Sequence, residues 1–294
     1  MMNLEGLKTW GGLAGASLAE ANVVVAGIPY DGSAVYRKGA ALAPSRIRGL
    51  SAVMPPVTED GRTLDGLKVH DMGDIDAGTE IETGWQTIAD ALEAIPAEAL
   101  LTVLGGDHCT AIGTLAAQAR RHGDISVLWV DAHPDLCDFS RGGKWTCGCA
   151  MRRGLEVSNI GPARVVIAGG RDYDPEELEF IRSRGMLLVS AHALATDERA
   201  AHQVAEALDG KKVHVSFDID VLDPAFAPGT EIPSAGGLTT RQALELLATA
   251  TKTSKLVGFD LVEVAPPFDN GDITSLAALK LIFEVWGLYW HGNR

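Results

Sequence analysis

The segment Ser126-Val127-Leu128-Trp129-Val130-Asp131-Ala132-His133-Pro134-Asp135 decides how the rest of this chain is interpreted. Its first half is an uninterrupted apolar run, which is typical of a strand buried in a sheet. Its second half places Asp131, His133 and Asp135 at alternate positions. If the strand conformation continues, period-two geometry puts these three side chains on one face. Carboxylates and an imidazole at the end of a buried strand indicate half of a metal site.

Apolar runs of strand length alternate along the chain with segments of helical spacing. The predicted strands cover residues 22–27, 67–70, 99–104, 126–130, 164–168, 186–190, 212–217 and 256–261. The predicted helices cover residues 43–48, 82–95, 111–121, 175–184, 198–208, 240–250 and 275–286. This alternation predicts one α/β domain over residues 1–294, with three layers (α/β/α) around a mostly parallel eight-stranded sheet. In open sheets of this class, ligands bind at the carboxyl ends of the strands.

The composition argues against two classes of protein. The net charge of −14 offers no basic surface for nucleic acid, although it is compatible with a cationic substrate. No apolar run is expected to reach membrane-spanning length, and the segment from Met1 to Trp10 lacks the pattern of a signal peptide. We therefore expect a cytoplasmic protein that binds neither nucleic acid nor membrane.

The cysteines are grouped in one part of the chain, at Cys109, Cys137, Cys147 and Cys149. Disulfides are unexpected in the cytoplasm, and the two paired Cys-x-x-Cys units of a zinc ribbon are missing. Buried free thiols are therefore predicted, with Cys147 as a special case that is described below.

Potential metal ligands follow three of the predicted strands. They are His108 after the third strand, Asp131, His133 and Asp135 after the fourth, and Asp218 and Asp220 after the seventh. One such residue alone is usually a helix cap or a turn residue. Several together favour a metal site, because carboxylates buried side by side are costly without a cation. Four carboxylates and two imidazoles exceed what one ion with a bound water needs, so two ions are predicted. Mn²⁺ suits this donor set, with Fe²⁺, Ni²⁺, Co²⁺ or Zn²⁺ as alternatives, and the implied reaction is metal-assisted hydrolysis.

At these residues the chain resembles the ureohydrolase family, which includes arginase, agmatinase and related amidinohydrolases. The matching motifs are Gly105-Gly106-Asp107-His108, Asp131-Ala132-His133-Pro134-Asp135 and Ser216-Phe217-Asp218-Ile219-Asp220. Residues 36–48 and the segment Glu263-Val264-Ala265-Pro266 look like the agmatinase branch. The resemblance runs from Gly27 nearly to the C-terminus. Its motifs are specific for the family but not for the substrate.

The resemblance implies an arginase-like fold, a trimeric or hexameric homo-oligomer and two Mn²⁺ ions per chain. One ion would be bound by His108, Asp131, Asp135 and Asp218, and the other by Asp131, His133, Asp218 and Asp220. A water activated by both ions would attack the guanidinium carbon and release urea and an amine, with Asp135 in the catalytic group. Glu263 stands where the family places a carboxylate that holds the guanidinium, a pairing that charge-assisted hydrogen bonds favour. The alternative for Glu263 is a surface acid in a loop.

One loop departs from the family pattern. It reads Lys144-Trp145-Thr146-Cys147-Gly148-Cys149, with Cys147 where a His that transfers protons is usual. A thiol there could take over the proton transfer, bind metal or attack carbon directly. Alternatively the position is not essential and water protonates the product. The sequence leaves these alternatives open.

Four further positions bear on the substrate. Glu231 stands where the family more often has Gly, so it can reshape the pocket. Asp174 resembles an acidic residue of arginase that binds the amino group of the substrate. The pair Asp174-Pro175 is equally well explained as the start of a helix. Arg141 and Lys144 are either solvated or hold the carboxylate of a guanidino acid.

The leading hypothesis is a binuclear manganese amidinohydrolase that acts on a linear guanidino compound such as agmatine. A guanidino acid (guanidinobutyrate, guanidinopropionate or arginine) and formimidoylglutamate are alternative substrates. A hypothesis of another class is a metal-binding protein with little catalysis, since the usual His is missing. The intact set of six ligands favours the enzyme.

Overall fold

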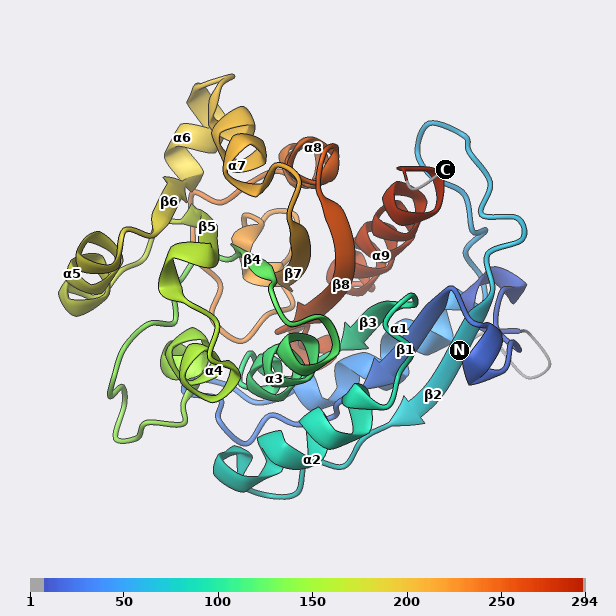
Figure 1. The fold of residues 1–294 in the computed structure, drawn as a ribbon, viewed down its shortest axis with the longest axis horizontal. Helices are drawn as coiled ribbons and strands as arrows, with labels where there is room; N and C mark the ends of the chain where they lie inside the picture. Colours follow the sequence, from blue (N-terminus) through green and yellow to red (C-terminus); the bar gives the residue numbers. More distant parts are fainter. Residues whose placement is uncertain (1–7, 293–294) are drawn as a thin grey trace.

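Within residues 8–292, which the computed structural model describes, eight strands form one sheet in the order β2-β1-β3-β8-β7-β4-β5-β6 (Figure 1). They are β1 (Val23–Gly27), β2 (Val69–Asp74), β3 (Leu100–Leu104), β4 (Ser126–Val130), β5 (Val165–Gly170), β6 (Leu187–Ser190), β7 (Lys212–Asp218) and β8 (Lys255–Val262). Every pair of neighbouring strands is parallel, so the predicted fold class is confirmed. Most of the segment searched for a signal peptide, residues 1–7, lies outside the described residues.

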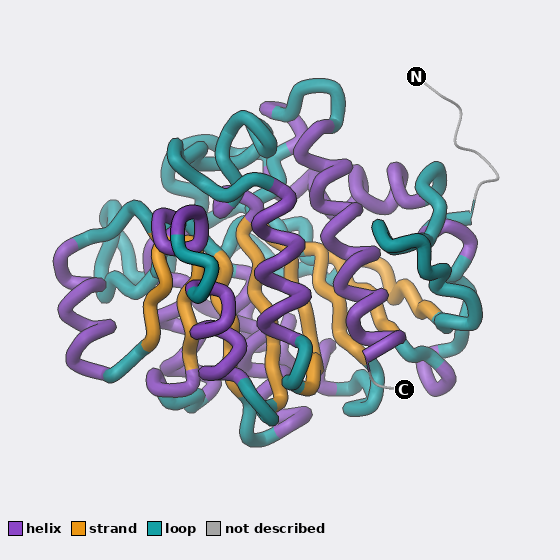
Figure 2. The backbone as a smooth tube through the Cα atoms, turned by 90° about the horizontal axis from the view of Figure 1, so that it is seen from above, coloured by secondary structure: helices purple, strands orange, loops and turns teal. Residues whose placement is uncertain are grey.

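Helices cover both faces of this sheet (Figures 1 and 2). They are α1 (Ala43–Ser51), α2 (Ile81–Glu93), α3 (Thr110–His122), α4 (Ala150–Ser158), α5 (Pro175–Arg184), α6 (Ala191–Thr196), α7 (Ala200–Leu208), α8 (Thr240–Thr251) and α9 (Ile273–Gly292). The sheet divides the core into two clusters, one shared with α1 and α6 to α9, the other with α2 to α5. Along β1, Val23 and Val25 belong to the first cluster and Val24 and Ala26 to the second, as side-chain alternation requires.

Some predicted elements were wrong in detail. The strand expected at residues 67–70 is β2, which extends through polar residues to Asp74 at the edge of the sheet. Most of β2 is only half buried, so polar residues are tolerated in it and it has no continuous apolar run. Helices α4 and α6 were not predicted. Two arginines interrupt the apolar spacing of α4, and α6 is only six residues long.

Helix α9 corrects the expectation that no apolar segment reaches membrane-spanning length. It is 20 residues long, and its mean hydropathy of 1.2 suffices to cross a membrane by length and composition alone. More than half of this window, 56%, is buried inside the protein. Its residues Ile282, Phe283 and Trp286 belong to the core cluster on one face of the sheet. A core helix accounts for this composition.

The carboxyl ends of four central strands lie level with one another. Strands β3, β8, β7 and β4 are neighbours in the sheet, although they are far apart in the sequence. Their registers pair Leu104 with Leu261, Leu261 with Phe217, and Phe217 with Val130. The residues that follow these strands therefore lie at one edge of the sheet, which is where the predicted ligand clusters were expected to meet.

Candidate metal centre and active site

The first group of predicted ligands surrounds His108, which follows β3. Its Nδ1 atom lies 3.0 Å from Asp131 Oδ2, 3.3 Å from Asp135 Oδ2 and 3.1 Å from Asp218 Oδ2. All four side chains are buried. Neither His108 Nδ1 nor Asp131 Oδ2 has a hydrogen-bond partner among the described residues. Buried polar atoms that face one another without hydrogen bonds are expected where a metal ion binds between them.

The second group surrounds His133 and shares Asp131 with the first. His133 Nδ1 lies 3.1 Å from Asp220 Oδ2 and 3.5 Å from Asp131 Oδ1. One potential ligand atom from each of these three residues lies within 4.8 Å of the other two. The structure thus brings together all six residues predicted as ligands, in two groups that meet at one carboxylate.

The ligands after β4 do not converge in the predicted way. The strand ends at Val130, so the residues that follow have no strand alternation. Instead the backbone amide of His133 donates to Asp131 Oδ1 at 2.7 Å, and Asp135 has a positive φ of 54°. Non-glycine residues rarely adopt this left-handed conformation, which is concentrated at functional sites. The turn, rather than a continuing strand, aims Asp135 toward His108.

The closely spaced carboxyl groups of this cluster favour the binding of a cation. Burial, with Asp220 and Asp131 nearby, raises the pKa of Asp218 well above its usual range. Burial and Asp131 likewise raise the pKa of Asp135. Burial opposes ionisation of His108, but Asp131 and Asp135 outweigh it and raise its pKa to about 9. These shifts indicate an excess of negative charge, which protons on the carboxyl groups and on His108 offset when no ion is bound. Divalent ions fit this donor set because they would take the place of those protons.

A chain of buried hydrogen bonds fixes the orientation of His108. Ser216 Oγ donates to Asp260 Oδ1 at 2.6 Å, so at 3.0 Å it accepts from His108 Nε2. His108 Nδ1 is then the nitrogen whose lone pair faces the carboxylates. Asp260 Oδ2 lies 2.7 Å from His214 Nε2, and Gln118 Nε2 lies 3.2 Å from His214 Nδ1. Outer partners of this kind hold a metal-binding imidazole in one tautomer.

Close packing also holds the His108 ring. It stacks on Trp129 with ring centroids 3.8 Å apart and planes 2° from parallel. The turn before it approaches another loop closely, because a Cβ atom at Gly106 would lie 1.8 Å from the backbone oxygen of Tyr30. Asp107 uses this approach, since its backbone amide donates to that oxygen at 2.7 Å.

Glu263 follows β8 and enters the same site. It has a positive φ of 64°, and its Oε1 accepts from the backbone amide of His108 at 2.8 Å. Its side chain is buried, and Oε2 has no hydrogen-bond partner among the described residues. Burial and the nearby Glu231 and Asp218 raise its pKa well above the usual range. The alternative of a surface acid is wrong, and a free carboxylate oxygen is available for a cationic group.

Cys147 also lines the site but is not part of either ligand group. Its Sγ atom lies 3.4 Å from Glu263 Oε1 and 3.6 Å from Glu231 Oε2. The neighbouring Cys109 thiol, burial and the carboxylate of Asp107 raise the pKa of Cys147 well above its usual range. A protonated thiol is a poor nucleophile, so this environment disfavours direct attack by Cys147. All four cysteines are buried free thiols, as predicted.

Glu231 joins the site to a distant loop. Its Oε1 accepts from the backbone amides of Val35 and Tyr36, the second at 2.8 Å. Arg37 reinforces the contact, because its guanidinium donates to the backbone oxygens of Thr230 and Glu231. Glu231 therefore shapes the pocket through this loop, while its other carboxylate oxygen faces Cys147.

A cavity of about 270 Å³ leads from the surface to these groups. Its carboxyl-bearing residues are Asp135, Asp172, Asp174, Glu177, Asp218, Asp220, Glu231 and Glu263. Among the described residues, Arg141 is the one Lys or Arg side chain in its wall, and it makes no hydrogen bond or ion pair with any of them. Lys144, by contrast, is paired with Asp138 at 3.6 Å outside the cavity.

Asp174 confirms the helix-start interpretation. It is the N-cap of α5, and its backbone amide donates to Glu177 Oε2 at 2.8 Å, as in a capping box. Its side chain accepts from Cys137 Sγ at 3.4 Å and borders the cavity. Contact between Asp174 and a substrate stays a prediction.

The sequence interpretation missed the residues that support the ligands. Ser216, Asp260, His214 and Gln118 form the chain behind His108, and Arg171 donates to the backbone oxygen of Asp220 at 2.6 Å. A role for Asp260 could have been predicted from the sequence, because it is an acidic residue within the apolar strand β8. Burying a carboxylate there is costly unless it has hydrogen-bond partners. Nothing local in the sequence points to Gln118.

A fully parallel sheet with imidazole and carboxylate donors at its carboxyl edge defines an α/β protein built to bind metal. Residues 21–287 of the chain match the model of the Arginase family. The chain belongs to the arginase family.

Three relatives of this chain are named for different activities. A proclavaminate amidinohydrolase from Streptomyces clavuligerus is 36% identical over 93% of this chain and 90% of that protein. A guanidinobutyrase from Pseudomonas aeruginosa is 34% identical over 92% and 87%, and an agmatinase from Bacillus cereus is 34% identical over 92% of each. The solved structure of the S. clavuligerus protein superposes with a TM-score of 0.89 at 34% identity, over 99% of this chain and 100% of that one.

Proposed function

We propose that this protein is a binuclear manganese amidinohydrolase that converts a linear guanidino compound to urea and an amine. The observation that carries the proposal is the pair of donor groups that share Asp131 beside the free carboxylate oxygen of Glu263. His108, Asp131, Asp135 and Asp218 would hold one ion, and Asp131, His133, Asp218 and Asp220 the other. When bound, two such ions supply a water of lowered pKa as the nucleophile.

The side chains around that centre have separate tasks. Glu263 accepts charge-assisted hydrogen bonds from the guanidinium through its free Oε2 and orients the carbon to be attacked. Asp135 lies in the cavity wall, where its carboxylate can take a proton from the nucleophile and return it to the leaving amine. The Cys147 thiol, which is protonated in this environment, is a second proton source beside Glu263.

The leading substrate is agmatine. Eight carboxyl residues line the cavity, and Asp172 and Asp174 lie on its wall together with the ligands, which favours a substrate that is cationic at both ends. The agmatinase among the relatives supports the same choice.

A guanidino acid is the second candidate, and one observation favours it. Arg141 lies in the cavity wall without a carboxylate partner among the described residues, so it is available for the far end of such a substrate. The guanidinobutyrase and the proclavaminate amidinohydrolase among the relatives support this alternative.

The deciding experiment measures urea release by the Mn²⁺-loaded protein with agmatine, arginine, guanidinobutyrate and guanidinopropionate, and formamide release with formimidoylglutamate. Urea from one guanidino compound supports the reaction and identifies the substrate. Two bound ions without turnover on any of these compounds would contradict the proposal and favour a metal-binding protein with little catalysis.

The cytoplasmic location and the trimeric or hexameric assembly are further proposals. Four buried free thiols support a reducing compartment. Family membership supports the assembly, and light scattering of the purified protein would test it.

A further inference from the structure

A second set of donor atoms lies in the wall of the cavity, apart from the six ligands. Cys147 Sγ is 3.4 Å from Glu263 Oε1 and 3.6 Å from Glu231 Oε2, and one donor atom of each residue lies within 4.8 Å of the other two. The exposed fractions of Cys147, Glu231 and Glu263 are 8%, 2% and 4%. Two carboxyl groups buried this closely lose free energy unless they are neutralised or share a cation.

We propose that Cys147, Glu231 and Glu263 form a third metal site, which selects a thiophilic divalent ion such as Zn²⁺ over Mn²⁺.

The spacing of the donors fits such an ion. Zn²⁺ binds sulfur at about 2.3 Å and carboxylate oxygen at about 2.0 Å with tetrahedral angles, which separates these two ligand atoms by about 3.5 Å. The two distances from Cys147 Sγ, 3.4 Å and 3.6 Å, lie on either side of that value. Three protein donors leave the fourth position of the ion open to a water in the cavity.

The carboxylates that face Cys147 are not fully used by the fold. Glu263 Oε1, the oxygen nearest Cys147 Sγ, accepts from the backbone amide of His108 at 2.8 Å, whereas Oε2 of the same carboxylate is buried and has no hydrogen-bond partner among the described residues. Glu231 binds the backbone amides of Val35 and Tyr36 through Oε1, which leaves Oε2 directed at the thiol. An unpartnered buried carboxylate oxygen is costly, and a cation would satisfy it.

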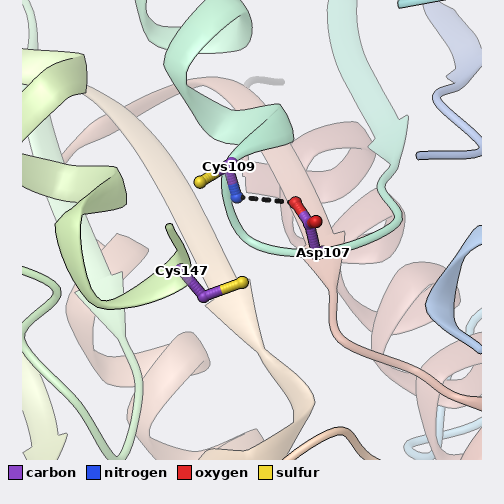
Figure 3. A group of neighbouring side chains, drawn as sticks. All are labelled: Asp107, Cys109 and Cys147. Carbon is purple, nitrogen blue, oxygen red and sulfur yellow. Dashed lines mark hydrogen bonds between the residues drawn. The ribbon is translucent and has the colours of Figure 1, made fainter. Parts of the chain in front are cut away.

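Two neighbouring clusters contain a cysteine but offer poorer donors. In the first, Asp107 Oδ1 accepts from the backbone amide of Cys109 at 3.1 Å (Figure 3) and Oδ2 accepts from that of Ser33 at 2.8 Å, so both of its oxygens have partners. In the second, beside Cys137, both oxygens of Glu177 accept backbone amides at 2.8 Å. These carboxylates already have partners.

The softness of sulfur separates the proposed site from the six-residue centre. Imidazole and carboxylate donors suit Mn²⁺, whereas a thiolate favours Zn²⁺ or Cd²⁺. An ion at Cys147 would also occupy Glu263, which the proposed function assigns to the guanidinium. On that assignment, Zn²⁺ competes with substrate.

The test titrates the Mn²⁺-loaded protein with Cd²⁺ and follows the ultraviolet charge-transfer absorption of cadmium–thiolate bonds. Metal analysis after desalting gives the Mn²⁺ and Cd²⁺ content of each sample. We expect one Cd²⁺ per chain with the thiolate absorption, while the Mn²⁺ content is retained. Absence of the thiolate absorption would overturn the proposal. No substrate is needed, so failure here is distinguishable from failure of the proposed reaction.

Single substitutions locate the sulfur ligand. Cys147→Ser should abolish the absorption, whereas Cys137→Ser, at the other thiol in the cavity wall, should retain it. Cys109→Ser should also retain it. Loss in Cys137→Ser, loss in Cys109→Ser, or retention in Cys147→Ser would each overturn the assignment.

A second variant covers the case in which Cys147→Ser fails to fold. Glu231→Gln keeps an amide oxygen for the backbone amides of Val35 and Tyr36 but loses a carboxylate ligand. We expect its Cd²⁺ affinity to fall by about tenfold or more, since even an outer partner of a metal ligand contributes that much. Unchanged affinity with native circular dichroism would remove Glu231 from the site and overturn the proposal.

Discussion

His108 Nε2 lies 3.0 Å from Ser216 Oγ, and this contact determines which nitrogen of the imidazole faces the carboxylates. The serine hydroxyl donates to Asp260, so it can only accept from His108. The lone pair of Nδ1 is thereby directed toward Asp131, Asp135 and Asp218 before any ion binds. Such preorganisation lowers the entropy cost of metal binding.

Removing this hydroxyl should weaken metal binding. In Ser216→Ala, we expect the Mn²⁺ affinity to fall by about 10- to 100-fold, because the imidazole loses its acceptor and can change tautomer. Calorimetric titration of the metal-free protein with Mn²⁺ measures the effect. Ser126→Ala is the matched control, since Ser126 is equally buried and its hydroxyl has no hydrogen-bond partner among the described residues. Equal affinities in the two variants would contradict the preorganisation argument.

The far end of the same hydrogen-bond chain depends on a glycine. A Cβ atom at Gly258 would lie 1.9 Å from Gln118 Nε2 and 2.4 Å from His214 Nδ1. We expect Gly258→Ala to lower the free energy of unfolding by about 2 kcal/mol or more, because both buried polar groups must move. Urea unfolding measures this change. Gly161→Ala should have little effect, since nothing lies within 4 Å of its added methyl group. Similar losses in both variants would rule out the steric explanation.

The ligands were predictable because their spacing is local. Alternating acids and imidazoles directly after apolar runs are visible in the sequence, and β4 spans the predicted residues 126–130. Parallel strands then bring their carboxyl ends to one edge, whatever their order. The order itself was not predictable, because the adjacency of β3 to β8 and of β4 to β7 depends on packing between distant segments.

Contacts over long sequence separations account for what was missed. Glu231 binds the backbone of Val35 and Tyr36 across about two hundred residues, and no periodicity encodes that pairing. The positive φ angles of Asp135 and Glu263 were equally hidden, because neither residue type requires that conformation. Tertiary contacts impose both turns, and these turns aim the two carboxylates.

Cys147→Ala should leave both Mn²⁺ ions bound. The thiol belongs to neither of the two ligand groups that share Asp131, so its removal deletes no donor from them. Metal analysis of the dialysed variant checks this. Loss of Mn²⁺ would show that Cys147 is a ligand of the centre rather than a proton donor. With metal retained, a fall in kcat of about a hundredfold would assign proton transfer to the thiol.

His122 should make the stability of the protein depend on pH. Burial, together with Arg121 and Lys212, lowers the pKa of His122 from 6.5 to about 4. Folding therefore favours the neutral ring, whose contribution is complete above pH 6.5 and is lost as the pH falls toward 4. Urea unfolding at about pH 7.5 and about pH 5 should show a larger loss for the wild type than for His122→Gln. His202→Gln, on the exposed side of α7, should follow the wild type, and a parallel loss in all three proteins would exclude His122 as the cause.

Arg141 should discriminate between substrates by the charge at their far end. It lies in the cavity wall without an ion-pair partner among the described residues, so it attracts a carboxylate and repels the amine of agmatine. We expect Arg141→Ala to lower the ratio of kcat/KM for guanidinobutyrate to that for agmatine by about five- to tenfold, since an exposed charge contributes about 1 kcal/mol. Lys144→Ala removes a cation from the same loop that is already paired with Asp138, so it should leave the ratio unchanged. If Lys144→Ala shifts the ratio as much as Arg141→Ala does, the general charge of the loop, rather than Arg141, sets the preference.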